Sequence, residues 1–273
     1  MIERVIYKNH INEIVEIGKD KIFVNKNDLR DFAWNITKKN GRISSFDKGV
    51  VKKTIPLVIV CSNEKEGIEI RNRIFEVMEK DVLAKKHGKF IIGDYYLRCY
   101  VTGSVKGDYF YSKGYMTLKL TVQTDFPEWV KESTTVFNTN AGNTSEFLDF
   151  LFDYPHDYTN ELNSGSIVNT GFMPSEFRIT VYGFVTNPTL YINRHEYSVN
   201  VEVGTGEYLT IDSTNKTIVL TKYNGEKVNC FNLRKKDSYI FEKIPEGDHV
   251  VTTSESFSFD ITLLEERGEP KWT

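Results

Sequence analysis

The chain has 273 residues, of which 40% are hydrophobic and 13% aromatic, and its formal net charge is −3. This composition is sufficient for one large all-β domain or two domains of ordinary size, and it excludes global disorder. No apolar run approaches the roughly 18 residues of a membrane-spanning helix, so we expect no membrane partner. The N-terminal MIERVIYKNH carries charges where a signal peptide needs an apolar core, which predicts synthesis in a cytoplasm.

Charge is distributed unevenly along the chain. Residues 1–130 contain 23 Lys and Arg against 17 Asp and Glu, whereas residues 131–273 contain 12 against 21. This asymmetry favours two domains that face different partners, and we place their boundary between 130 and 131. It is too mild, and too poor in Arg clusters, to indicate a nucleic-acid-binding surface.

The first domain, 1–130, is predicted to be a β domain with one helix. Ile14–Ile17, Ile22–Val24 and Thr54–Cys61 are β-prone apolar runs that predict strands. The stretch Lys38–Gly49 is polar, basic and interrupted by glycine, so we expect a long exposed loop. Long loops inside compact domains are often functional.

One helix is predicted near 64–86. Asn63 can cap its first turn, with Glu66 three residues later as in a capping box, and Gly88 is a plausible stop. An apolar stripe at helical spacing is expected to pack on the domain's own sheet. Its members are Ile70, Ile74, Val77 and Met78.

The chain returns to strands after this helix. Hairpins are predicted around Gly93-Asp94 and Lys113-Gly114, and the first domain ends at the turn that contains Trp129. The polar residues 131–145 that follow are short of branched aliphatic side chains, so we interpret them as the domain junction.

The second domain, 131–273, is predicted to be an antiparallel β-sandwich. Between Phe177 and Leu220, short alternating segments are separated by turn residues. The alternation places Phe177, Ile179 and Val181 on one side of a strand. Arg178, Thr180 and Tyr182 lie on the other.

Catalytic signatures are absent from the sequence: it has no nucleophile elbow, phosphate-binding loop, dinucleotide fingerprint or H-E-x-x-H motif. Three well-separated cysteines, Cys61, Cys99 and Cys230, are expected to be buried free thiols. We therefore expect no catalytic residues, no cofactor and no metal.

Two groups of acidic residues are possible sites. The segment Asp153–Asp157 could supply oxygen and imidazole ligands to a metal, but it is a proline-containing loop that favours a structural role. Glu207, Asp212 and Glu226 could in principle meet as a glycosidase pair, although acidic residues are ordinary at β-turns.

Several stretches together resemble the distal tail proteins (Dit) of siphophages that infect Gram-positive bacteria. The matching pieces follow one another along most of the chain: GKFIIGDYYLRCYVTG, FPEW, DYPHDY, NTGFMPSEFRITVYGFVTNPTLYI, GEYLTIDSTNKTIVL, YIFEKIPEGDHVV and EERGEPKW. No single one of them is diagnostic. The resemblance lies in their order and spacing.

The resemblance implies a structural protein of the virion tail tip, from an active phage or a prophage. Members of the family pair a tail-tube-like N-terminal β domain, which carries one helix, with a galectin-like or carbohydrate-module-like C-terminal sandwich. Six N-terminal domains close into a homo-hexameric ring. That ring joins the tail tube protein to the tail-associated lysin or baseplate hub protein, and in many phages it supports receptor-binding proteins.

Two sets of residues are candidate sites. If the protein forms a ring, the basic residues of the predicted loop, Lys38, Lys39, Arg42 and Lys48, are candidates for a subunit interface. The alternative function is a carbohydrate-binding adhesion module that contacts the host cell wall. Tyr182, Tyr191 and Tyr208 would then stack on sugars.

Overall fold

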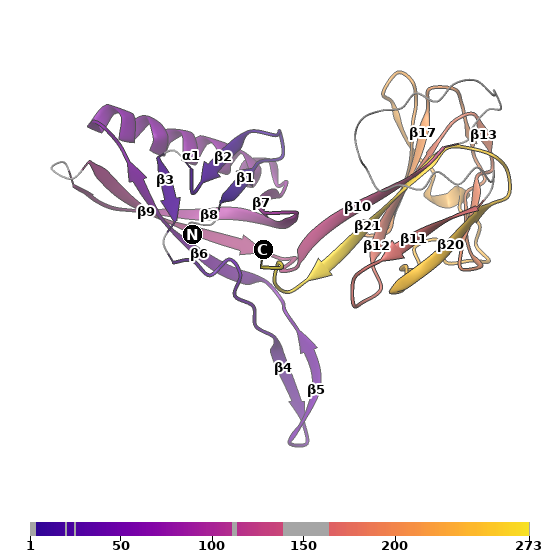
Figure 1. Ribbon diagram of the computed structural model, residues 1–273, viewed down its shortest axis with the longest axis horizontal. Coiled ribbons are helices and arrows are strands. Elements are labelled where there is room, and N and C mark those ends of the chain that lie inside the picture. Colours follow the sequence, from indigo (N-terminus) through magenta and orange to yellow (C-terminus); the bar gives the residue numbers. More distant parts are fainter. Residues whose placement is uncertain (1–3, 20, 25, 111–113, 139–163, 273) are drawn as a thin grey trace. The chain divides into compact units, whose positions relative to one another are not determined.

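A computed structural model describes the chain except for residues 1–3, 20, 25, 111–113, 139–163 and 273, and it is mainly β (Figure 1). The chain divides into two compact units, each with its own hydrophobic core. Unit 1 is Met1–Lys131 with Glu266–Thr273, and unit 2 is Glu132–Glu265. The C-terminal segment, which the sequence assigned to the second domain, therefore belongs to unit 1.

Unit 1 consists of two antiparallel sheets that share one strand. Their orders are β2-β1-β7-β8-β10 and β3-β6-β9-β8. β8 pairs with β7 through its first part and with β9 from Tyr100 onwards, and a bulge at Val101/Gly103 follows soon after this change of partner. Because a bulge bends its strand, β8 can pass from one sheet to the other. The strands are β1 (Val5–Lys8), β2 (Ile14–Ile17), β3 (Ile22–Val24), β4 (Asn35–Lys39), β5 (Arg42–Asp47), β6 (Val51–Val60), β7 (Gly88–Ile92), β8 (Tyr95–Phe110), β9 (Tyr115–Thr124) and β10 (Trp129–Phe137).

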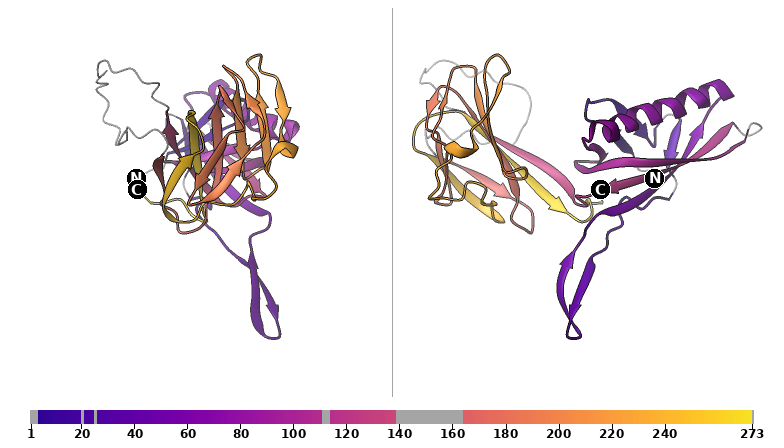
Figure 2. Two further views of the ribbon diagram at one scale, coloured as in Figure 1. Left: turned by 90° about the vertical axis from the view of Figure 1, so that its right-hand side faces the viewer. Right: turned by 180° about the vertical axis from the view of Figure 1, so that it is seen from behind.

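The helix α1 (Glu64–Ala84) lies along unit 1, as Figure 2 shows. The Asn63 side chain accepts a hydrogen bond from the Glu66 amide at 3.0 Å, and the Glu66 carboxylate accepts one from the Ser62 amide at 2.7 Å. The predicted stripe packs into the core, because Ile74, Val77 and Met78 are buried and Ile70 is partly buried. These features confirm the predicted helix start and its packing.

The helix ends earlier than predicted. Lys85 adopts the left-handed conformation, with φ of 53°, and its amide donates back to carbonyls of the last turn. Gly88, the predicted stop, is instead the first residue of β7. A side chain at this position would collide with the Asp81 carboxylate and the Tyr7 ring, which explains the glycine on packing grounds.

Asp81 anchors the helix to the first sheet from inside the core. Its carboxylate is fully buried and accepts hydrogen bonds from the Tyr7 hydroxyl at 2.5 Å and from the His10 amide at 2.9 Å. The His10 ring also contacts it at 2.5 Å through Nδ1. Burial, followed by the hydrogen bond to Asp81, raises the pKa of the Tyr7 phenol. A buried carboxylate with this many partners holds α1 against β1.

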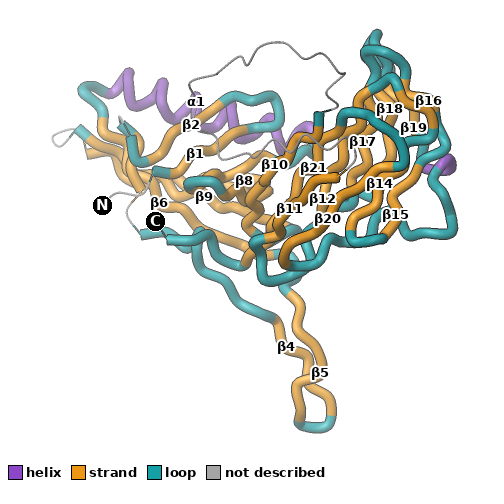
Figure 3. The backbone as a smooth tube through the Cα atoms, turned by 45° about the vertical axis from the view of Figure 1, so that its right-hand side comes forward, coloured by secondary structure: helices purple, strands orange, loops and turns teal. Residues whose placement is uncertain are grey.

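The stretch Lys38–Gly49, expected to be a loop, is mostly the second strand and turn of a hairpin. Among the described strands, β4 and β5 pair with each other alone, so they form a separate ribbon (Figure 3). Asn40 and Gly41 form the turn, with φ of 51° and 73°. Positive φ at both positions is the type I′ geometry that two-residue hairpins favour, and Asn-Gly is its commonest sequence.

Unit 2 is an antiparallel sandwich, as the sequence predicts. One sheet has the order β19-β18-β17-β12-β21-β10, and the other has the order β11-β20-β14-β15. Besides β10, the elements are β11 (Ser164–Asn169), β12 (Glu176–Tyr182), β13 (Val185–Thr186), β14 (Thr189–Ile192), β15 (His195–Ser198), β16 (Glu202–Val203), β17 (Tyr208–Asp212), β18 (Thr217–Thr221), β19 (Lys227–Asn229), the short 3-10 helix η2 (Phe231–Leu233), β20 (Gly247–Thr253) and β21 (Phe259–Arg267).

The predicted alternation in β12 is confirmed. Phe177, Ile179 and Val181 are fully buried, while Arg178 and Thr180 on the opposite face are not. Ile179 pairs in register with the buried Ile211 of β17, so both point into the space between the two sheets.

The expected junction, 131–145, differs from a simple linker where the structure describes it. Strand β10 continues to Phe137, whose ring stacks on Phe259 at 4.5 Å within unit 2. Residues 139–145 lie outside the described part of the chain. Trp129, just before the boundary, is fully buried in the core of unit 1.

Replacing Ile179 or Ile211 by Ala should lower the free energy of unfolding by about 2–4 kcal/mol, because each change leaves a cavity in the sandwich core. Thr180→Ala, on the outer face of the same strand, is the matched control and should cost much less. Denaturant titration of the full chain measures both. Equal losses at Ile179 and Thr180 would contradict the assigned faces.

Replacing Tyr7 by Phe should lower stability by about 1–3 kcal/mol, because the buried Asp81 carboxylate loses a donor while the packing volume stays nearly the same. Thermal unfolding followed by circular dichroism measures the loss. An unchanged transition would show that Asp81 does not depend on this hydroxyl.

Candidate functional site

The β4–β5 hairpin carries an apolar face that its own chain leaves exposed. The register pairs Ile36 with Phe46 and, beyond a bulge in β5, Lys38 with Ile43. Residues opposite each other in antiparallel strands point to the same face, so Ile36, Phe46 and Ile43 share one side. They are 50%, 59% and 53% exposed. Trp34, which precedes β4 and is 49% exposed, contacts the Phe46 ring edge-on at 6.3 Å.

The four predicted interface residues divide into two groups. Lys38 lies on the apolar face, and the opposed pair Lys39 and Arg42 lies on the other face beside the turn. All three are exposed. Lys48 is different, because its side chain is only 9% exposed. Its Nζ lies 3.1 Å from Glu128 and 4.6 Å from the centre of the Trp34 ring. Lys48 therefore fixes the base of the hairpin and is not available at its surface.

The segment that leads into the hairpin is held by buried polar contacts. Lys53 of β6 is 5% exposed, and its Nζ donates to the Asp28 carbonyl at 3.0 Å and also to the Asp31 carbonyl. Burial lowers the pKa of the Lys53 amine, and the nearby Asp28 and Asp31 oppose this shift. The C-terminal segment packs here as well: Arg30 donates to the Pro270 carbonyl at 2.8 Å. The root of the hairpin is therefore fixed.

The three predicted sugar-facing tyrosines do not converge. Tyr182 and Tyr208 are opposed in the β12–β17 register, so their side chains lie on the same outer face, 40% and 38% exposed. The Tyr182 hydroxyl donates to Asp260 at 2.6 Å, which raises the pKa of the phenol to about 12. Tyr191 is on β14 in the other sheet, opposite Glu196.

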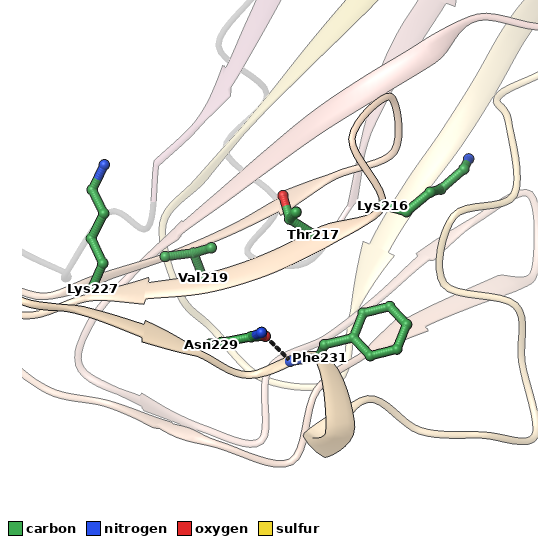
Figure 4. A pocket seen from close by; sticks show the side chains of 6 residues that line it. All are labelled: Lys216, Thr217, Val219, Lys227, Asn229 and Phe231. Carbon is green, nitrogen blue, oxygen red and sulfur yellow. Dashed lines mark hydrogen bonds between the residues drawn. The ribbon is translucent and has the colours of Figure 1, made fainter.

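A pocket opens on the outer face of β18 and β19 in unit 2. Its volume is about 400 Å³, and Figure 4 shows Lys227 and Lys216 towards opposite ends of it. Its lining residues are Lys216, Thr217, Val219, Lys227, Asn229 and Phe231. The three tyrosines are not among them.

Two of the three candidate glycosidase carboxylates, those of Glu207 and Asp212, stabilise turns. Glu207 accepts a hydrogen bond from the Gly204 amide at 3.0 Å, and Asp212 accepts one from the Asn215 amide at 2.9 Å. The possible metal segment Asp153–Asp157 lies outside the described residues. Within the described part of the chain, no cluster of His, Cys, Asp and Glu is suited to hold a metal ion.

Two further expectations can be compared with the structure. Cys61, Cys99 and Cys230 are buried free thiols, as predicted, and burial raises the pKa of Cys99. None of the described helices is long and apolar enough to span a membrane.

Sequence reasoning missed the apolar residues of the hairpin. The available signal was Asn40-Gly41, preceded by a segment in which Trp34 and Ile36 alternate with polar residues. The basic residues dominate the composition of this stretch, and they led to the expectation of a loop.

Replacing Asp260 by Asn should lower the pKa of Tyr182 from about 12 towards its usual 10.0, because the phenol loses a charged acceptor. In the parent protein, folding favours the neutral form of the Tyr182 phenol. The contribution of this contact to the stability of the folded protein is therefore complete below pH 10, and it is lost as the pH rises through about 12. Ultraviolet titration, with Tyr182→Phe used to subtract the other tyrosines, measures the change. An identical titration in both proteins would contradict the contact.

Comparison with known proteins identifies the fold. No protein-family model matches the sequence, and no curated protein matches it significantly. The SPP1 Dit (gp 19.1) protein, described as a paradigm of hub adsorption apparatus in Gram-positive infecting phages, is similar in structure, with a TM-score of 0.60 and 11% sequence identity over 98% of this chain and 100% of that one. Two structures of the phage P2 baseplate in its activated conformation also contain a similar chain. The chain of the structure with Ca is 12% identical in sequence, and the chain of the structure with Sr is 13% identical. In both cases the TM-score is 0.62, and the match covers 99% of this chain and 100% of that one. The chain therefore has, over its full length, the two-part β fold of phage Dit and baseplate proteins.

Proposed function

We propose that this chain is a structural, non-enzymatic subunit of a phage tail tip. Six copies close into a ring through unit 1, and the ring joins the tail tube to the baseplate hub protein and to the host-recognition proteins. The protein acts in the virion, after synthesis in the host cytoplasm.

The observation that carries this proposal is the β4–β5 hairpin. It presents Ile36, Ile43 and Phe46 to solvent on a ribbon that pairs with no other described strand. A contiguous apolar surface on a monomer is typical of a protein–protein interface. The full-length structural similarity to a Dit protein and to phage baseplate chains supports the proposal that this interface forms within a phage tail.

A ring explains why one copy leaves this surface open. In a closed ring every subunit offers one surface to the neighbour on one side and a different surface to the neighbour on the other. The hairpin supplies one such surface, and Lys38, Lys39 and Arg42 keep it soluble before assembly.

The alternative, a carbohydrate-binding adhesion module, has weaker support. Sugar binding through aromatic stacking needs several rings on one surface. Only Tyr182 and Tyr208 are adjacent, and Tyr191 belongs to the other sheet. The scaffold role is therefore the better interpretation.

Removing the hairpin should give a folded protein that no longer forms rings. Asn35 and Asp47 are register partners, so a two-residue Asn-Gly turn can join them and replace residues 36–46. We expect the parent protein to have six times the mass of one chain in light scattering and to form rings in negative-stain images. We expect the shortened protein to be monomeric with an unchanged thermal transition.

The matched control is Tyr182→Ala with Tyr208→Ala, which alters exposed aromatic residues of unit 2 and should leave rings intact. Rings that persist without the hairpin would exclude it as the interface. A parent protein that stays monomeric at high concentration would contradict the ring itself.

A further inference from the structure

Helix α1 has a second apolar stripe that faces away from the core. Phe75, Val82 and Leu83 are 49%, 39% and 76% exposed. At 100° per residue Phe75 and Val82 lie on one flank of the helix, beside the buried stripe, and Leu83 lies opposite the buried Ile74. The predicted stripe accounts for one face of α1 only, and the folding of unit 1 leaves the other face uncovered.

This outer face is acidic as well as apolar. Glu76 is exposed and Glu79 half-buried. Glu79 lies between Phe75 and Leu83 around the helix, and Glu76 lies on the same side of the helix as Leu83. Lys80, in the same half of the helix, is already paired with Glu13 at 2.7 Å. We call the set Phe75, Glu76, Glu79, Val82 and Leu83 the helix patch.

The hairpin face complements the helix patch in both properties. Its apolar residues Ile36, Ile43 and Phe46 lie beside Lys38, and the paired strands carry three basic residues against one acid, Asp47. The lengths also agree: the strand from Trp34 to Lys38 spans about 13 Å and the helix from Phe75 to Leu83 about 12 Å. The hairpin face is therefore apolar with a positive charge, and the helix patch is apolar with negative charges and has a similar length.

We infer that the β4–β5 hairpin of one copy lies on the helix patch of the neighbouring copy, with Lys38 beside Glu76 and Glu79. Both surfaces belong to unit 1, and both are exposed within a single chain, so both are available to a second copy. The contact joins two different surfaces, which is the heterologous geometry that closes a ring. The inference rests on the proposed ring and specifies which surfaces meet in it.

The first test is a covalent cross-link between copies. The native cysteines are buried, so Lys38→Cys combined with Glu79→Cys places two reactive thiols at the surface. A short bis-maleimide is preferable to a disulfide, which requires Cα atoms within about 7 Å. We expect a ladder of covalent multimers up to the hexamer on a denaturing gel. Each single-cysteine variant should give no band above a dimer.

The second test exchanges the charges. Lys38→Glu should raise the concentration at which rings form by about tenfold, because one interfacial pair becomes a repulsion. Glu79→Lys, combined with Glu76→Lys, should do the same. The chain that carries all three substitutions should recover assembly, since its neighbours are again complementary. Lys236→Glu, at an exposed position in unit 2, is the control and should assemble like the parent.

The results of these tests distinguish failure of the hairpin–helix contact from failure of the proposed ring. Parent rings with no ladder, and with assembly unchanged by Lys38→Glu or by the helix substitutions, would overturn this contact and leave the proposed ring standing. Rings weakened by each substitution without recovery in the combined chain would also overturn the pairing. A monomeric parent would overturn both. A ladder together with recovery establishes the contact.

Discussion

The buried Asp81 carboxylate is the constraint on which the surfaces of unit 1 depend. It joins α1 to Tyr7 and His10 near the end of β1, and Gly88 leaves room for it where β7 begins. A buried charge must keep its partners, so the helix cannot rotate about its axis or slide along the sheet without leaving the carboxylate unpaired. This contact fixes which face of α1 enters the core and therefore which face is left outside.

The apolar residues of the β4–β5 hairpin are exposed, because no other described sheet packs on them. In β12 the alternation buries Ile179 against the other sheet, and in β4 the same alternation leaves Ile36 in solvent. An isolated two-stranded ribbon is marginally stable in water, so this one depends on its fixed root and on what covers it. The Lys48–Glu128 ion pair and the buried Lys53 amine supply the root.

The elements that the sequence predicted are those whose pattern is set locally. The helix start at Asn63, the buried stripe through Ile74 and the faces of β12 follow from capping and periodicity, and the structure confirms them. The hairpin was missed because basic residues dominate the composition of the stretch, and because the bulge in β5 interrupts the alternation after the turn. The role of Lys48 and the return of the C-terminal segment to unit 1 depend on contacts between distant residues, which local patterns do not encode.

If the proposed ring forms, its closure would reconcile a small contact with a stable assembly. The hairpin and the helix patch each offer only a few apolar side chains, and a single exposed ion pair contributes little on its own. In an open chain of subunits, each such contact would exchange rapidly. Once the ring closes, every subunit is held on two sides and the last contact forms within one assembly, where the effective concentration is high. In the proposed ring, surfaces of this modest size would therefore be enough to hold each subunit between its two neighbours.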